Sequence, residues 1–140
     1  MKRAGVVCLL LAVAAVVSAC ASADHTWRGE FDARLEGAAA ALEERLPELT
    51  PASTEGELFT ASQVLAHTLA FKQKLIEKLN PPDGCEEVQE EGDRAVGGIA
   101  QFNYVLLKNL TPYLRRHLGG DERERLAKLR KIEAKSKTCE

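Results

Sequence analysis

The sequence predicts an all-α protein: an up-down antiparallel bundle of about four helices that follows a cleaved N-terminal signal. Apolar residues recur every three or four positions after residue 25, which is the period of one buried helix face. Aromatic residues make up only 5% of the chain, while leucine and alanine are plentiful. Proline and glycine clusters at 47–53, 80–84 and 119–120 separate the periodic stretches, and such short connections favour antiparallel neighbours.

The N-terminal stretch has the composition of an export signal. Lys2 and Arg3 precede an uncharged run of 16 residues from Ala4 to Ala19, which is short for a permanent membrane span. The run leads into Val17-Ser18-Ala19-Cys20, an aliphatic residue and two small residues followed by cysteine. This pattern resembles the bacterial lipobox, the processing site of lipoproteins.

The resemblance implies cleavage before Cys20 and a diacylglycerol thioether on its sulfur, often with a further acyl chain such as palmitate on the new amino group. The chain then divides into a lipoprotein-type signal peptide (1–19), a short tether (20–25) and a single helical-bundle domain (26–140). The motif covers four residues and the leader, so it identifies a processing route and no protein family.

Two other interpretations of the leader stay open. Ala21-Ser22-Ala23 fits a signal-peptidase site, and cleavage there would discard Cys20 and release a soluble protein that begins at Asp24. Alternatively, the leader stays uncleaved and anchors the chain.

The cysteines predict one disulfide bond. Of the four in the chain, Cys8 lies in the leader and Cys20 is lipidated or discarded, which leaves Cys85 and Cys139. An even number in an exported chain favours a structural disulfide. In an up-down bundle these two positions come to the same end.

The first two helices are predicted over residues 26–46 and 55–79. The first has apolar residues at helical spacing from Trp27 to Leu46, and Pro47 ends it. Thr54 and Glu57 form a capping box before the second. Its wide apolar arc comprises Leu58, Ala61, Val64, Leu65, Leu69, Phe71, Leu75, Ile76 and Leu79.

The third helix begins at Glu86, after the two prolines of the 80–84 turn, and Pro112 is predicted to break it. The Gly97-Gly98 pair either marks a close contact with another helix or has no structural role. Asp121 is expected to cap a fourth helix that ends near Lys135. The apolar face of the third helix comprises Val88, Ala95, Val96, Ile99, Phe102, Leu106, Leu107, Leu110 and Tyr113.

Charge is unevenly distributed. The formal charge of −2 becomes −4 when Lys2 and Arg3 leave with the signal, so the composition favours no nucleic-acid partner. Residues 113–137 hold nine Lys or Arg against four Asp or Glu, whereas residues 20–112 are acidic overall. In the predicted bundle the acidic residues 86–93 face the basic residues 128–137.

Few residues suggest chemistry. His25, His67 and His117 lack the spacing of metal ligands, so no metal site and no cofactor are predicted. No catalytic motif is present, and we expect a protein that is not an enzyme. Lys72 lies within the apolar arc, where we expect its stem to pack and its amine to reach water. The alternative is a buried cation that pairs with a carboxylate of another helix or of a ligand. Asn103 lies among apolar residues and is expected to bond a neighbouring backbone group.

The expected function is that of an exported, lipid-anchored lipoprotein that acts as a non-catalytic binding module at the cell envelope. Its partners would be the membrane, through the anchor at Cys20, and an unidentified envelope protein. The location would be the cell membrane or an outer membrane, facing away from the cytoplasm. The alternative is a soluble secreted carrier of a small apolar ligand, which needs an under-filled space between the first three helices.

Overall fold

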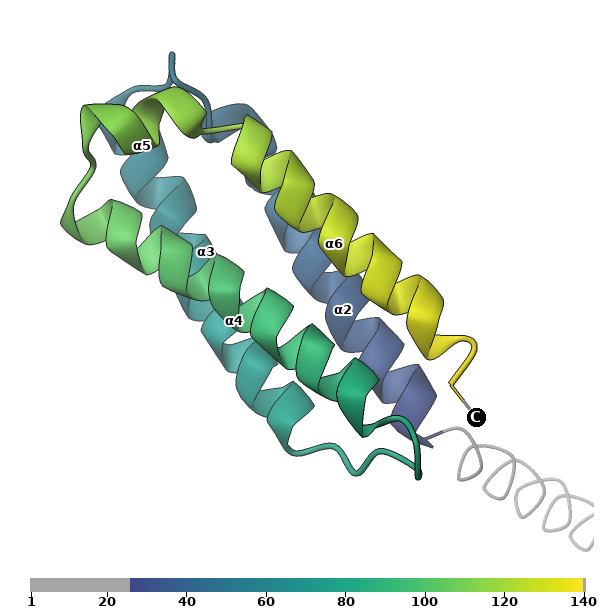
Figure 1. Cartoon of the computed structure of the whole chain (residues 1–140). Helices are drawn as coiled ribbons and strands as arrows, with labels where there is room; N and C mark the ends of the chain where they lie inside the picture. The colour runs from purple at the N-terminus through teal and green to yellow at the C-terminus, as the bar shows by residue number, and fades with distance from the viewer. Residues whose placement is uncertain (1–25, 140) are drawn as a thin grey trace, which may run out of the picture.

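The computed structural model describes residues 26–139, and within them the chain forms an antiparallel bundle of helices (Figure 1). This part of the chain contains no strand, so the predicted all-α up-down bundle is confirmed. The leader, Cys20 and His25 lie outside the described residues. The long helices are α2 (Thr26–Arg45), α3 (Glu55–Glu77), α4 (Glu86–Lys108) and α6 (Gly120–Ser136), and the short ones are the 3-10 helix η1 (Leu46–Glu48) and α5 (Pro112–His117).

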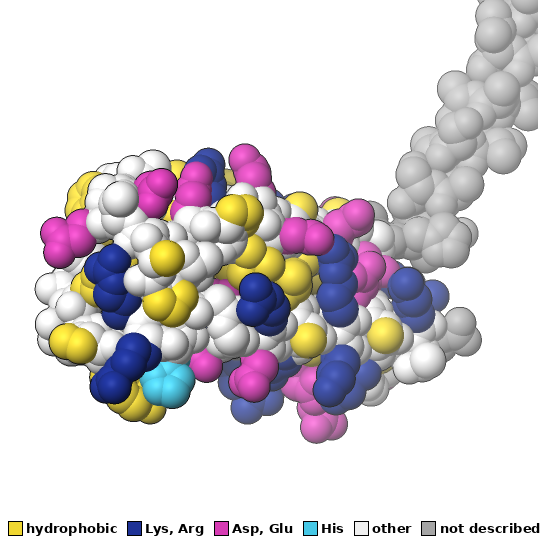
Figure 2. Space-filling view, turned by 90° about the horizontal axis from the view of Figure 1, so that it is seen from above, with side chains coloured by type: hydrophobic (Ala, Val, Ile, Leu, Met, Phe, Trp, Pro, Cys, Tyr) yellow, Lys and Arg dark blue, Asp and Glu magenta, His cyan; other side chains and the backbone are white. Residues whose placement is uncertain are grey.

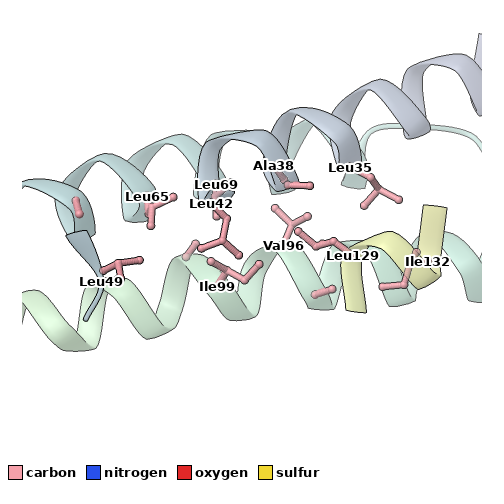
Figure 3. Close-up of a cluster of buried hydrophobic side chains, with 14 of the residues drawn as sticks. Leu35, Ala38, Leu42, Leu49, Leu65, Leu69, Val96, Ile99, Leu129 and Ile132 are labelled. Atoms are coloured by element: carbon pink, nitrogen blue, oxygen red, sulfur yellow. The ribbon is translucent and has the colours of Figure 1, made fainter. Parts of the chain in front are cut away.

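The long helices surround one core, in the order α2, α3, α4, α6. Helix α3 packs most extensively against α4, and α2 packs against α6. Figure 3 shows leucine, isoleucine, valine and alanine side chains from all four helices pointing into the shared space. Burial of each larger one stabilises the fold by about 1.5–3 kcal/mol. The labelled residues are Leu35, Ala38, Leu42, Leu49, Leu65, Leu69, Val96, Ile99, Leu129 and Ile132.

Glycines let α4 approach its neighbours closely. A Cβ atom on Gly92 would lie 2.6 Å from the Phe31 ring of α2, and one on Gly97 would lie 2.5 Å from the Gln73 side chain of α3. A side chain at either position would displace the facing residue. Gly98 faces open space, so only the first glycine of the Gly97-Gly98 pair marks a helix contact.

The N-terminal cap of α3 is the one predicted from the sequence, whereas the predicted cap of α6 is wrong. The Thr54 hydroxyl accepts from Glu57 N at 3.2 Å, and the Glu57 carboxylate accepts from Thr54 N at 2.7 Å, which is the predicted capping box. Asp121, in contrast, does not cap α6. Gly119 holds that position with a φ of 88°, and Asp121 lies two residues later, as the second residue of the helix. The positive φ favours glycine there.

The predicted break at Pro112 is confirmed. Helix α4 ends at Lys108, and α5 starts at Pro112 with the Thr111 hydroxyl accepting from Leu114 N at 3.1 Å. Helix α5 runs across the end of the bundle instead of along α4 (Figure 1). Arg115 holds it there, because its guanidinium donates to the carbonyl oxygens of Pro51 and Ser53 in the α2–α3 connection.

Two aromatic residues predicted to lie on apolar faces are exposed instead. Phe71 is 63% exposed and Tyr113 is 64% exposed. Phe71 stands at the edge of the wide α3 arc. Tyr113 follows the break, so its direction is set by α5 and not by the face of α4.

The opposite end of the bundle is fastened by several contacts. Cys85 and Cys139 form a disulfide with their Cα atoms 5.7 Å apart, as predicted. Arg28 donates to the carbonyl oxygen of Cys139 at 2.6 Å. The Lys135 ammonium lies 2.8 Å from Glu91, in agreement with the predicted meeting of basic and acidic clusters, and it lowers the pKa of that carboxyl. These contacts hold the C-terminus against α2 and α4.

Replacing Cys139 with serine is expected to lower the free energy of unfolding by about 2–4 kcal/mol, because the unfolded chain regains the freedom of a 54-residue loop. Urea denaturation of wild type and Cys139→Ser measures this difference. Reduced wild type serves as the control and should match the variant. An identical midpoint for oxidised wild type and variant would contradict a stabilising disulfide.

Candidate functional site

A groove opens between α3 and α4 at the end of the bundle where α5 lies. The first turns of α3 and the last turn of α4 form its sides, and the chain just after α4 closes it. Its volume is about 230 Å³. The residues that line this α3–α4 groove are Glu55, Leu58, Phe59, Ser62, Leu106, Leu107, Lys108 and Leu110.

The walls are apolar and the rim is charged. Leucines from α3 and α4 make most of the lining, and Phe59 stands at the edge with 55% of its surface exposed. Glu55 and Lys108 are exposed charges of opposite sign among the lining residues. The Lys108 ammonium lies 4.4 Å from the centre of the Tyr104 ring, a distance at which the ring attracts the cation.

Ser62 is the one lining residue that is both polar and buried. It is 1% exposed, and its hydroxyl has no hydrogen-bond partner among the described residues. Asn103, on α4, donates to the carbonyl oxygen of Ile99 at 2.9 Å, as predicted, while its own side-chain oxygen has no partner in the described chain. Most buried polar atoms in proteins are paired, so both atoms stand out.

Exposed aromatic and apolar side chains gather at the same end. Tyr104 and Val105 are 46% and 39% exposed near the end of α4, and Tyr113 projects from α5. Tyr113 also packs on the His117 ring, with their centroids 4.5 Å apart. Viewed from above the bundle, hydrophobic side chains reach the surface between basic and acidic ones (Figure 2). Aromatic residues rimmed by charge are typical of protein-binding surfaces.

The other residues singled out in the sequence do not form a site. His67 is exposed, as expected from its place on the polar face. Lys72 is partly buried, and its amine lies against Gly37 of α2, where an added Cβ atom would be 2.7 Å from Nζ. In residues 26–139 no three His, Cys, Asp or Glu side chains gather as metal ligands. No helix in this range is long and apolar enough to cross a bilayer.

Sequence reasoning missed Glu122, the most buried charged side chain of the described chain. It is 0% exposed in the first turn of α6, where its Oε1 pairs with Arg125 at 3.0 Å and its Oε2 has no partner among the described residues. The Arg125 guanidinium in turn lies 3.9 Å from the centre of the Phe102 ring. Burial raises the pKa of Glu122, and Arg125 opposes that rise. The signal was present, since Glu122 stands seven residues before Leu129, on the same buried stripe.

Comparison of the chain with protein-family models, with curated protein sequences and with solved structures finds no match. The role of the groove is therefore inferred from the residues that line it and from their arrangement. An apolar groove with one buried hydroxyl, two rim charges and nearby exposed aromatics has the chemistry of a binding site.

Replacing Glu122 with glutamine is expected to raise stability at pH 7 by about 1 kcal/mol, because an amide is cheaper to bury than a carboxylate. The raised pKa means that native Glu122 binds its proton more tightly than the unfolded chain does. Wild-type stability therefore falls as pH rises from the ordinary value of 4.5 to the raised one, and the advantage of the variant grows over that interval.

Urea denaturation of both proteins at several pH values tests this. Glu124→Gln, an exposed change in the same turn, is the matched control. A difference between Glu122→Gln and wild type that stays constant with pH would show that Glu122 keeps its ordinary pKa.

Proposed function

We propose that this chain is an exported lipoprotein, anchored through acylated Cys20, whose helical bundle is a non-catalytic module that binds a protein of the cell envelope through the α3–α4 groove. The observation that carries the proposal is the position of the groove. It lies, with its exposed aromatics, at the end of the bundle away from the start of α2 at Thr26.

The distances support a groove presented away from the membrane. The six residues 20–25 reach at most about 20 Å when fully extended, so the start of α2 stays near the lipid surface. Helix α3 has 23 residues and is about 34 Å long, and the groove is at its N-terminal end, far from that tether. A bundle that stands on the membrane exposes the groove to other envelope proteins.

The disulfide supports export. Cys85 and Cys139 are paired in the structure, and structural disulfides are typical of oxidising compartments outside the cytoplasm. The lipobox-like Val17-Ser18-Ala19-Cys20 accounts for attachment to the cell membrane or to an outer membrane after export.

The alternative, a soluble secreted carrier of a small apolar ligand, has less support. Pockets for small ligands usually measure about 300–1,000 Å³, and the groove has about 230 Å³. It also lies at the surface between two helices, whereas the carrier hypothesis places its cavity among the first three.

Replacing Cys20 with alanine is expected to abolish acylation, because the thioether needs the cysteine sulfur. The product is then either the unprocessed precursor, which keeps its leader, or a soluble chain cleaved after Ala23, without the two or three acyl chains that hold a protein firmly. Intact mass of the wild-type product and its partitioning into detergent measure the anchor directly. Cys85→Ser is the matched control and should stay acylated. An unmodified N-terminus at Asp24 would contradict lipidation.

A photo-reactive amino acid in place of Phe59, at the edge of the groove, is expected to crosslink one envelope protein in intact cells. The same amino acid in place of Phe71 is the matched control, since Phe71 is similarly exposed on α3 but does not line the groove. Mass spectrometry identifies the adduct. Identical adducts from both positions, or none from position 59, would argue against the groove as the binding surface.

A further inference from the structure

We propose that the α3–α4 groove receives a single aromatic side chain with a polar tip, tyrosine or tryptophan, from the partner protein, and that this tip hydrogen-bonds to the Ser62 hydroxyl. The inference rests on the proposed function and specifies the chemistry of its binding site.

The size of the groove suits one side chain. Its volume of about 230 Å³ lies below the usual range for small-molecule pockets. Protein interfaces concentrate their binding energy in a few large anchors that fill such pockets, and tyrosine and tryptophan are the commonest of them.

Ser62 selects for a polar tip. Ser62 is one of the residues that line the groove, is 1% exposed, and has a buried hydroxyl without a partner among the described residues. A leucine or phenylalanine anchor would leave that hydroxyl unpaired, whereas a tyrosine O–H or an indole N–H would donate to it. Buried aromatic residues with polar tips usually find such a partner. The leucine walls at positions 58, 106, 107 and 110 accept the apolar body of the same side chain.

The two charged residues at the rim, Glu55 and Lys108, indicate which residues should lie beside the aromatic side chain in the partner protein. Glu55 is exposed at the start of α3 and Lys108 is exposed at the end of α4, where the Tyr104 ring 4.4 Å away holds its ammonium. A partner segment that carries a basic residue on the Glu55 side of its anchor and an acidic residue on the Lys108 side complements both. This charge pattern fits a polypeptide better than an apolar small molecule, which would leave both charges unmatched.

The test compares probes that differ in one hydroxyl. N-acetyl-tyrosinamide and N-acetyl-phenylalaninamide are titrated separately into the mature acylated protein in lipid nanodiscs, and leucine methyl NMR reports where each binds. The tyrosine probe is expected to shift the methyl signals of Leu58, Leu106, Leu107 and Leu110 and to bind about fivefold more tightly than the phenylalanine probe, the ratio expected for one net hydrogen bond.

Three variants distinguish the contribution of the Ser62 hydroxyl to binding from that of the groove walls. Ser62→Ala keeps the walls and removes an unpaired buried hydroxyl, so it should stay folded and bring the affinity ratio to about one. Phe59→Ser changes a half-exposed edge and should weaken both probes equally, whereas Phe71→Ser should weaken neither.

Equal binding of both probes to wild type, a ratio unchanged by Ser62→Ala, or shifts confined to leucines outside the groove would each overturn the inference. Tighter binding of octanoate than of either aromatic amide at the groove would also overturn it, in favour of a small apolar ligand. If these probes fail while the crosslink at position 59 persists, the aromatic anchor is wrong and the proposed function stands. If the crosslink fails as well, both are wrong.

Discussion

Helix α4 has to lie close to three other helices at once, and the rest of the bundle depends on this contact. Small residues make the approach possible, since Gly92 accommodates the Phe31 ring from α2 and Gly97 accommodates Gln73 from α3. A side chain at either glycine would push a neighbouring helix outward and open the leucine core between them. The third neighbour, α6, is joined to α4 covalently through Cys85 and Cys139 and electrostatically through Glu91 and Lys135.

The two ends of the bundle are consequently unlike. At one end, the disulfide and the contacts of the last residues with α2 and α4 tie down both the C-terminus and the α3–α4 turn. At the other end, α4 stops at Lys108 because Pro112 cannot continue its hydrogen bonding, and the chain turns across the bundle as α5. With no continuing helix beside the first turns of α3, leucines from the end of α4 and from α3 border an open groove instead of a closed core. The feature that ends the helix thus also produces the candidate site.

Several buried polar groups lie near this open end. Ser62, Asn103 and Glu122 belong to three different helices, and each has one buried side-chain atom without a partner in the described residues. Nearer the disulfide-bonded end, Arg34 Nε and Asp93 Oδ1 are also buried without a partner in the described residues, while the Trp27 indole donates to Gln89 at 2.6 Å. Unpaired buried polar atoms reduce stability.

The sequence by itself determined the features that depend on neighbours along the chain. Helical spacing placed the long helices, Thr54 and Glu57 predicted their capping box, Pro112 predicted the break, and up-down topology brought Cys85 to Cys139. Only the tertiary structure decided which side chains the helices cover. It exposed Phe71, buried Glu122, replaced Asp121 by Gly119 as the cap of α6, and left the Ser62 hydroxyl unpaired beside a groove. Periodicity along one helix marks a stripe, such as the one that Glu122 shares with Leu129, but the distance and rotation of helices remote in sequence decide how far that stripe is covered.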